Sequence, residues 1–128
     1  MENFNGKIAV ITGGGTGMGR ELTYQLAAEG CNVSICDVIE ENMEETFQQA
    51  SKKYPQVKIT KHLCDVSSED DVLRFRDEVL EQQETEHINL LFNNAGIGGG
   101  ASFVLSGIEE WERTFKICWD GVYLCSRA

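Results

Sequence analysis

The stretch Thr12-Gly13-Gly14-Gly15-Thr16-Gly17-Met18-Gly19 directly follows the short apolar run Lys7–Ile11 (KIAVI). The run is rich in β-branched residues and predicts a buried strand. A helical pattern of apolar residues starts at Gly17, and Gly30 is placed to cap the end of that helix. Five glycines within seven residues are more than a turn requires, and glycine lets the backbone approach another molecule closely. We therefore interpret this unit as a ligand site in preference to a simple turn.

The rest of the chain repeats the alternation of strand and helix. We predict further strands over 32–37, 57–63 and 88–92, where short apolar runs occur. Between them, apolar residues recur three and four positions apart, as in amphipathic helices. Four strand–helix units in strict alternation predict an α/β fold, a Rossmann-like doubly wound parallel sheet with right-handed crossovers. The open apolar edge of the fourth strand suggests that this single domain, residues 1–128, is truncated before later strands.

Local signals predict where three of the helices begin or end. Pro55 closes the second helix because its ring cannot continue a helix. Ser67 with Asp70, and Ser106 with Glu109, have capping-box spacing, so each serine is predicted to cap a helix. The last helix carries an apolar stripe, for which we favour a core-facing role over a subunit interface. The stripe consists of Ile108, Trp111, Phe115, Cys118, Val122 and Cys125.

A second glycine cluster follows the strand predicted over 88–92. It contains Gly96, Gly98, Gly99 and Gly100. In a doubly wound sheet the first and fourth strands are neighbours at the point where strand order reverses, and ligands bind there. Both glycine clusters are thus predicted to face one crevice. The first cluster places backbone N–H groups and the positive end of a helix dipole in that crevice, which favours a pyrophosphate.

The spacing of the glycines indicates which nucleotide binds. GxGxxG does not occur, whereas GxxxGxG occurs at Gly13, Gly17 and Gly19, and the Gly-Lys-Ser/Thr of a P-loop is missing. The second predicted strand ends at Asp37, 18 residues after Gly19. A carboxylate there can accept hydrogen bonds from both hydroxyls of an adenosine ribose. Because it also repels a 2′-phosphate, we predict NAD as the cofactor.

Composition argues against several other functions. Acidic residues outnumber basic ones by 21 to 11, a net charge of −10, which opposes binding to nucleic acid or to an anionic membrane. No apolar run approaches the ~20 residues of a membrane span, and residues 1–7 lack a signal-peptide pattern, so we predict a cytoplasmic protein. The five cysteines form no CxxC pair. We predict no metal site, and we expect Cys31, Cys36 and Cys64 to be small buried hydrophobes.

Three motifs in the same order resemble the short-chain dehydrogenase/reductase family, and the match extends along essentially all 128 residues. The family's TGxxxGxG motif stands at residues 12–19, its Asp-Val pair at Asp65 and Val66, and its NNAG motif at residues 93–96. The resemblance implies an oxidoreductase that transfers a hydride between NAD and a small alcohol or ketone. It also implies a homodimer or homotetramer.

The resemblance assigns a role to each segment of the site. Residues 13–19 would hold the pyrophosphate, Asp37 the ribose, Asp65 and Val66 the adenine, and residues 94–96 would line the sheet end near the cofactor. Without the family pattern, Asp65 is read equally well as a loop carboxylate that caps a helix. The full predicted set is Thr12, Gly13, Gly15, Thr16, Gly17, Met18, Gly19, Asp37, Asp65, Val66, Asn94, Ala95 and Gly96.

The chain departs from the family pattern in two respects. The family's catalytic Ser and its Tyr-x-x-x-Lys pair lie beyond the fourth helix, whereas this sequence ends at Ala128. Only Tyr54 has a lysine four residues later, and the adjacent Pro55 makes that spacing a coincidence. Cys118 stands where the family usually has Asn. We therefore predict a cofactor-binding half without catalytic residues of its own.

Two alternatives to an oxidoreductase remain to be discriminated. A non-catalytic dinucleotide-binding or interaction module would bind the cofactor and show no activity with any alcohol or ketone. A methyltransferase would use a similar sheet and ribose-binding acid, but the glycine spacing and the NNAG motif disfavour it.

Overall fold

The computed structural model describes residues 3–98 and 102–128. Met1, Glu2, Gly99 and Gly100, which entered the predictions above, lie outside these residues. In chain order the elements are β1 (Ile8–Thr12), α1 (Gly17–Ala28), β2 (Asn32–Asp37), α2 (Glu40–Lys53), β3 (Ile59–Leu63), α3 (Glu69–Gln83), β4 (Leu90–Phe92), α4 (Ile108–Phe115), the π-helical segment η1 (Lys116–Asp120) and α5 (Gly121–Arg127).

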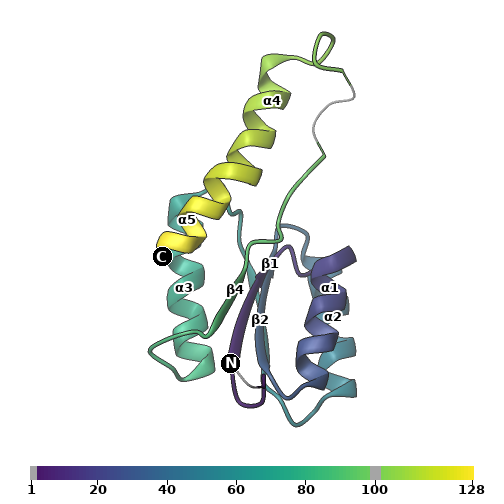
Figure 1. Cartoon of the computed structure of the whole chain (residues 1–128), viewed down its shortest axis with the longest axis vertical. Helices are drawn as coiled ribbons and strands as arrows, with labels where there is room; N and C mark the ends of the chain where they lie inside the picture. The colour runs from purple at the N-terminus through teal and green to yellow at the C-terminus, as the bar shows by residue number, and fades with distance from the viewer. Residues whose placement is uncertain (1–2, 99–101) are drawn as a thin grey trace.

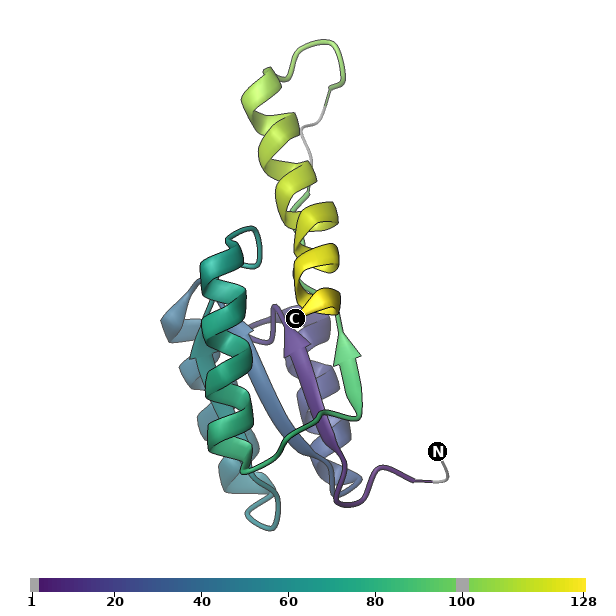
Figure 2. The same ribbon diagram turned by 90° about the vertical axis from the view of Figure 1, so that its left-hand side faces the viewer.

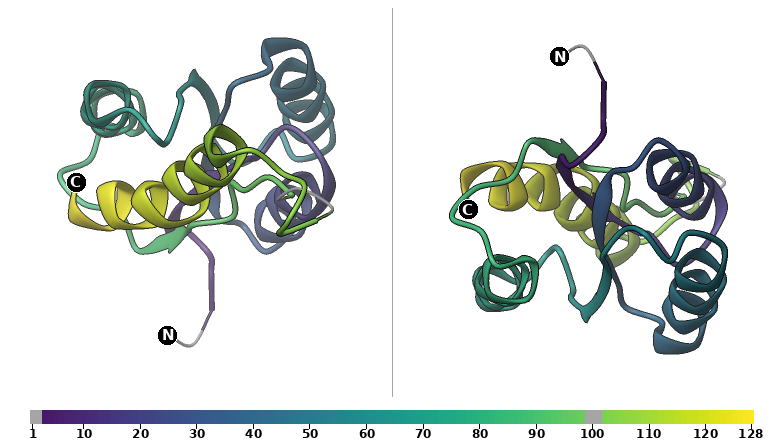
Figure 3. Two further views of the ribbon diagram at one scale, coloured as in Figure 1. Left: turned by 90° about the horizontal axis from the view of Figure 1, so that it is seen from above. Right: turned by 90° about the horizontal axis from the view of Figure 1, so that it is seen from below.

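The strands form a parallel sheet in the order β3-β2-β1-β4. β1 pairs with β2 from Ile8 opposite Asn32, and with β4 from Ala9 opposite Leu90. The strand order therefore reverses between β1 and β4. Helices α1 and α2 cover one face of the sheet, and α3 lies on the other (Figure 1, Figure 3). The predicted Rossmann-like α/β fold is confirmed.

Each face of the sheet has its own hydrophobic core. Successive strand residues point to opposite faces, so Ile11 joins the core under α1 and α2, whereas Val10 joins the core under α3. Cys31 lies in the first core, and Cys36 and Cys64 lie in the second. All three thiols are buried and free, which confirms their prediction as small hydrophobes.

The strand boundaries differ slightly from those predicted. β3 begins at Ile59 instead of Val57, because the Val57 amide donates to Tyr54 O in the turn after α2. β4 begins at Leu90 instead of Ile88, because the Ile8 amide donates to the side-chain oxygen Oδ1 of Asn89, at 2.9 Å, and not to a backbone carbonyl of that segment. At the end of α1 the glycine prediction is confirmed: Gly30 has φ +82° and donates to Ala27 O.

Both capping-box predictions are wrong by one residue. Ser68 caps α3, its hydroxyl accepting from the Asp71 amide, while Ser67 donates its own amide and hydroxyl to Asp65. Ser67 is thus used in the turn, and the next serine, Ser68, caps the helix, because spacing alone cannot distinguish two adjacent serines. The N-cap of α4 is Gly107, one residue after Ser106, and it has no side chain with which to cap the helix.

Helix α4, η1 and α5 form one continuous rod that extends beyond the sheet (Figure 2). Its predicted core-facing stripe is wrong for most members. Trp111, Phe115 and Val122 are exposed. Cys125, a member of the predicted stripe, packs against the core under α3 as expected, and Ile117 and Leu124, which the stripe did not include, pack against the same core. The cause is twofold, since α4 projects past the sheet and the wider π turn of η1 changes which residues share a face.

Candidate nucleotide-binding site

A cleft of about 410 Å³ lies at the carboxyl ends of the parallel strands. It collects residues from the glycine loop, the end of β2, the segment after β3 and the segment after β4. Such a position, at the reversal of strand order, is where doubly wound sheets bind ligands. The predicted residues that line it are Gly13, Thr16, Gly17, Met18, Asp37, Asp65, Val66, Asn94, Ala95 and Gly96.

The glycine loop leaves the first turn of α1 open towards the cleft. Gly13 and Gly17 have φ values of +68° and +54°, a left-handed conformation that favours glycine. No side chain caps the helix at Thr16, and its first turn has no acidic residue. Its amides and the positive end of its dipole therefore suit an anionic ligand.

Two glycines of the motif have different physical roles. A Cβ at Gly17 would meet nothing within 4 Å and would project into open space. A Cβ at Gly19 would collide with Gly13 O and would lie 2.6 Å from Asn94 Nδ2. Gly19 does not line the cleft, and it is required for the close packing of α1 against the loop.

Thr12 and Asn94 join the ends of β1 and β4. The Thr12 hydroxyl oxygen accepts from the amides of Asn94 (3.1 Å) and Ala95 (3.0 Å). In return, Asn94 Nδ2 donates to the carbonyls of Thr12 and Gly13, each at 3.0 Å. Thr12 is buried and does not line the cleft. The structure thus places it behind the site, where it holds the segment after β4 in position.

Asp37 connects β2 to the glycine loop. Its Oδ2 accepts from the Gly15 amide at 2.9 Å, and its Oδ1 accepts from the amides of Val38 (2.8 Å) and Ile39 (3.2 Å). An ionised carboxylate has about four acceptor positions, so capacity for a further donor remains. Gly15 itself is buried behind this contact and does not line the cleft.

Arg20, the first cation after the glycine motif, is directed towards α2. Its guanidinium donates to Gly15 O, Thr46 Oγ1 and Asn42 O, and it pairs with Glu45 at 2.9 Å. This clamp holds the glycine loop against α2. Sequence reasoning missed it, because nothing in the local pattern predicts a partner 26 residues away.

The segment after β3 is held by hydrogen bonds on both sides of Asp65. Its Oδ1 accepts from the Ser67 hydroxyl at 2.6 Å, and its amide donates to Asp71 Oδ2 at 3.0 Å. That amide holds the pKa of the Asp71 carboxyl below its usual value. The neighbouring Val66 side chain is buried against the helix that begins at Gly121, where an added Cβ would lie 2.7 Å from Val66 Cγ2.

The sequence did not single out the other residues that line the cleft. Val38 and Ile39 follow Asp37 directly, so adjacency was an available signal. The Cys36 thiol is an unreactive part of the wall, because the hydrogen bond with Cys64 and burial raise the pKa of Cys36 well above its usual range. The unpredicted lining residues are Cys36, Val38, Ile39, Asn42, Cys64, Ile97, Arg113 and Ile117.

A parallel sheet with a glycine loop after β1 and a carboxylate at the end of β2 defines a nucleotide-binding α/β domain. Residues 7–128 match the family model described as short chain dehydrogenase. The chain belongs to this family.

Named relatives agree with this assignment. The chain is 34% identical over 116 residues to epidermal retinol dehydrogenase 2 of Homo sapiens, covering 91% of this chain and 37% of the relative. It is 32% identical over 124 residues to meso-2,3-butanediol dehydrogenase of Serratia marcescens, covering 97% and 47%. The chain therefore spans less than half the length of these relatives.

Solved structures share the fold. NAD⁺-bound xylitol dehydrogenase superposes with a TM-score of 0.88 at 30% identity, covering 98% of this chain and 47% of that one. A short chain dehydrogenase/reductase from Burkholderia phymatum in complex with NAD gives 0.90 at 32% identity, covering 99% and 44%. Within residues 3–98 and 102–128, no helix combines the length and the apolar character needed to cross a membrane.

Proposed function

We propose that this chain is the cofactor-binding portion of an NAD-dependent oxidoreductase that transfers a hydride between nicotinamide and an alcohol or carbonyl carbon. The observation that carries the proposal is the Asp37 carboxylate, fixed by the Gly15 amide at the rim of the cleft. Relatives named for retinol, butanediol and xylitol, all of them alcohols, support the substrate class.

The residues of the cleft fit a dinucleotide. The open first turn of α1 and the loop from Gly13 to Gly19 suit a pyrophosphate, and the remaining acceptor position of Asp37 suits a ribose hydroxyl. Asp65 and Val66 would hold the adenine, and residues 94–96 would border the cofactor at the sheet end. When bound, NAD supplies a centre that accepts or donates a hydride.

Proton transfer to the substrate oxygen needs a positioned acid, and no tyrosine among the described residues supplies a phenol to this cleft. Tyr24 donates its hydroxyl to Gln49, Tyr123 accepts from Arg127, and Tyr54 caps the end of α2. None of these tyrosines lines the cleft. A positioned acid contributes about 10²- to 10⁴-fold to such a reaction. We therefore expect the 128-residue chain to bind NADH without measurable turnover.

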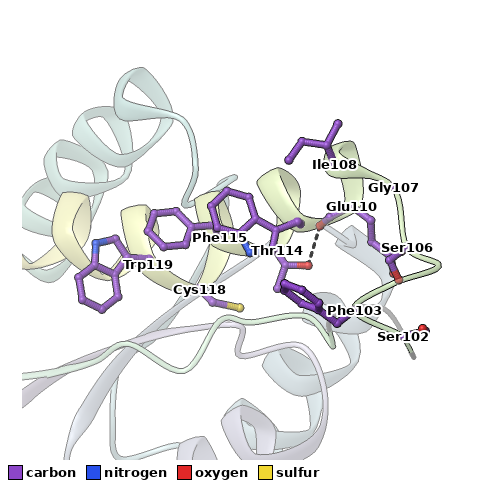
Figure 4. A pocket seen from close by; sticks show the side chains of 11 residues that line it. Ser102, Phe103, Ser106, Gly107, Ile108, Glu110, Thr114, Phe115, Cys118 and Trp119 are labelled. Atoms are coloured by element: carbon purple, nitrogen blue, oxygen red, sulfur yellow. Dashed lines mark hydrogen bonds between the residues drawn. The ribbon is translucent and has the colours of Figure 1, made fainter.

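An exposed aromatic face on α4 and η1 supports the proposal of a homodimer or homotetramer. Trp111, Phe115 and Trp119 stack along the helix with ring centroids 5.3 and 5.8 Å apart. Together with Phe103 they line a groove of about 870 Å³ (Figure 4). An apolar groove of this kind commonly marks a protein interface. Sedimentation of the wild type and of Trp119→Glu tests it, with self-association expected only in the wild type.

The experiment that tests the proposed function measures ligand class and turnover together. The chain is titrated with NADH and, separately, with S-adenosylmethionine, and NADH oxidation is followed with a panel of small ketones. We expect saturable binding of NADH and none of S-adenosylmethionine. Preferential binding of S-adenosylmethionine would refute the oxidoreductase assignment, and robust turnover by the purified chain would refute the absence of an acid.

A further inference from the structure

A second cleft of about 470 Å³ adjoins the nucleotide cleft. Val38, Asp65, Arg113 and Ile117 line both cavities, so the two are continuous at the end where the proposed function places adenosine. Three of these four residues are apolar or acidic. Arg113, from the last turn of α4, is the cation at the junction.

The side chain of Arg113 makes no polar contact with the described part of the chain. Within residues 3–98 and 102–128, no ion pair shorter than 4.0 Å and no side-chain hydrogen bond involves it, in contrast to Arg20 and Arg74. Arg113 is also exposed. Its guanidinium can therefore take up a ligand without losing an existing contact.

The walls around Arg113 suit a flat heterocycle. Val38 is 61% exposed and Ile117 is partly buried, so both present apolar surface at the junction. A guanidinium is planar and stacks on aromatic faces. We propose that Arg113 is a positioning residue for the adenine, with its guanidinium stacked on the ring from the α4 side. This inference rests on the proposed function, because it assumes an adenine dinucleotide in the cleft.

The charges nearby oppose an extra phosphate as the partner of Arg113. Asp37 and Asp65 line the nucleotide cleft, and in the adjoining one the carboxylates of Asp65, Glu109 and Glu112 outnumber the cations Arg113 and Lys116. These carboxylates would repel the 2′-phosphate of NADP. An uncharged adenine has no such conflict, and its π face attracts a cation.

The test compares Arg113→Ala, Arg113→Lys and Lys116→Ala. Lys116 also lies on the rod and lines only the second cleft, so it is a matched control for loss of a positive charge. AMP binding is measured by calorimetry, and NADH and NADPH binding by fluorescence. We expect Arg113→Ala to weaken AMP and NADH by about 5- to 30-fold, in parallel. Arg113→Lys should recover less than half of the lost affinity, measured on a logarithmic scale. The affinity of Lys116→Ala for both ligands should stay within about twofold of that of the wild type.

Other outcomes overturn the inference in distinct ways. If Arg113→Ala binds AMP and NADH as tightly as the wild type does, Arg113 does not contact the adenine, and the proposed function still stands. Full recovery in Arg113→Lys, or an equal loss in Lys116→Ala, would show a charge effect without stacking. If Arg113→Ala weakens the binding of NADPH alone, Arg113 contacts the 2′-phosphate and not the adenine. If the wild type binds neither NADH nor AMP, the proposed function itself is refuted.

Discussion

Asp37 Oδ2 accepts a hydrogen bond from the Gly15 amide at 2.9 Å, so the carboxylate at the end of β2 is fixed directly to the glycine loop. The position of this carboxylate is thereby set before any ligand arrives. Two unit charges of like sign about 4 Å apart repel by on the order of 4 kcal/mol at an effective dielectric of ~20. The contact therefore links the fold to the choice between NAD and NADP.

Replacement of this carboxylate should reduce cofactor discrimination. We expect the wild type to prefer NADH over NADPH by at least about tenfold, and Asp37→Ser to narrow the gap because it removes the negative charge. Fluorescence titrations of both proteins with both cofactors measure the ratio. Equal or tighter binding of NADPH by the wild type would contradict the assigned role of Asp37.

Gly17 and Gly19 have different roles, so their variants should differ in NADH binding. Gly17→Val should abolish NADH binding because its side chain projects into the space next to the glycine loop. It should also lower the free energy of unfolding by about 1–2 kcal/mol, because φ of +54° strains a valine, while the far-UV circular dichroism stays near that of the wild type. Gly19→Ala should lower the free energy of unfolding by at least about 2 kcal/mol, since its Cβ meets the backbone at Gly13. Retained NADH affinity in Gly17→Val would place the pyrophosphate elsewhere.

Thr12 should support the site through the fold. Thr12→Val leaves the part-buried amides of Asn94 and Ala95 without their acceptor. A fully buried unsatisfied donor costs about 1–3 kcal/mol, and these two amides face the open cleft, so we expect chemical denaturation to show a total loss of about 1–3 kcal/mol. Thr12→Ser keeps the hydroxyl oxygen and is the control, with stability expected within about 1 kcal/mol of the wild type. If Thr12→Val has the same free energy of unfolding as the wild type, these hydrogen bonds contribute little to stability.

A buried polar chain under α3 should make stability depend on pH. Gln83 donates to Ser34, which contacts Thr60, which contacts His62 Nε2, while His62 Nδ1 lies 2.8 Å from Glu78. Burial lowers the pKa of His62, although the hydrogen bond with Glu78 acts in the opposite direction. Glu78 also lies 3.6 Å from Arg74, which offsets part of its negative charge.

The sign of the pH effect follows from that lowered pKa. Stability from a depressed histidine is complete above its unfolded value of about 6.5 and is lost as pH falls through the folded value. Thermal unfolding of the wild type and of His62→Gln is compared between pH 7.5 and pH 5. We expect the wild type to be more stable than His62→Gln at pH 7.5, and we expect this difference in stability to become smaller as the pH falls to 5. A gap that widens towards pH 5 would mean that the imidazolium is the stabilised form.

The parts of the fold that were predictable from sequence are those with local causes. The apolar run before Gly13, the carboxylate at Asp37 and the glycine cap at Gly30 each depend on a few adjacent residues. Because parallel strands end at one edge of the sheet, the convergence of these segments at the cleft followed from the alternation of strands and helices.

The features that sequence reasoning missed depend on tertiary contacts. Arg20 reaches Thr46, Gly121 admits Val66, and Arg113 enters the cleft from a helix that leaves the sheet. The apolar stripe of the last helix was misassigned because a regular helical period was assumed where η1 is π-helical. None of these features has a signal within one turn of the residue concerned.

Equilibrium titration of the 128-residue chain with NADH, with stoichiometry determined by calorimetry, is the decisive experiment for the assignment of this cleft. We expect one saturable site per chain, from which AMP and ADP-ribose displace NADH, because both ligands contain the adenosine that Asp37 and Asp65 would hold. Absence of saturable binding, or binding that AMP leaves unchanged, would contradict the assignment of this cleft to an adenine dinucleotide.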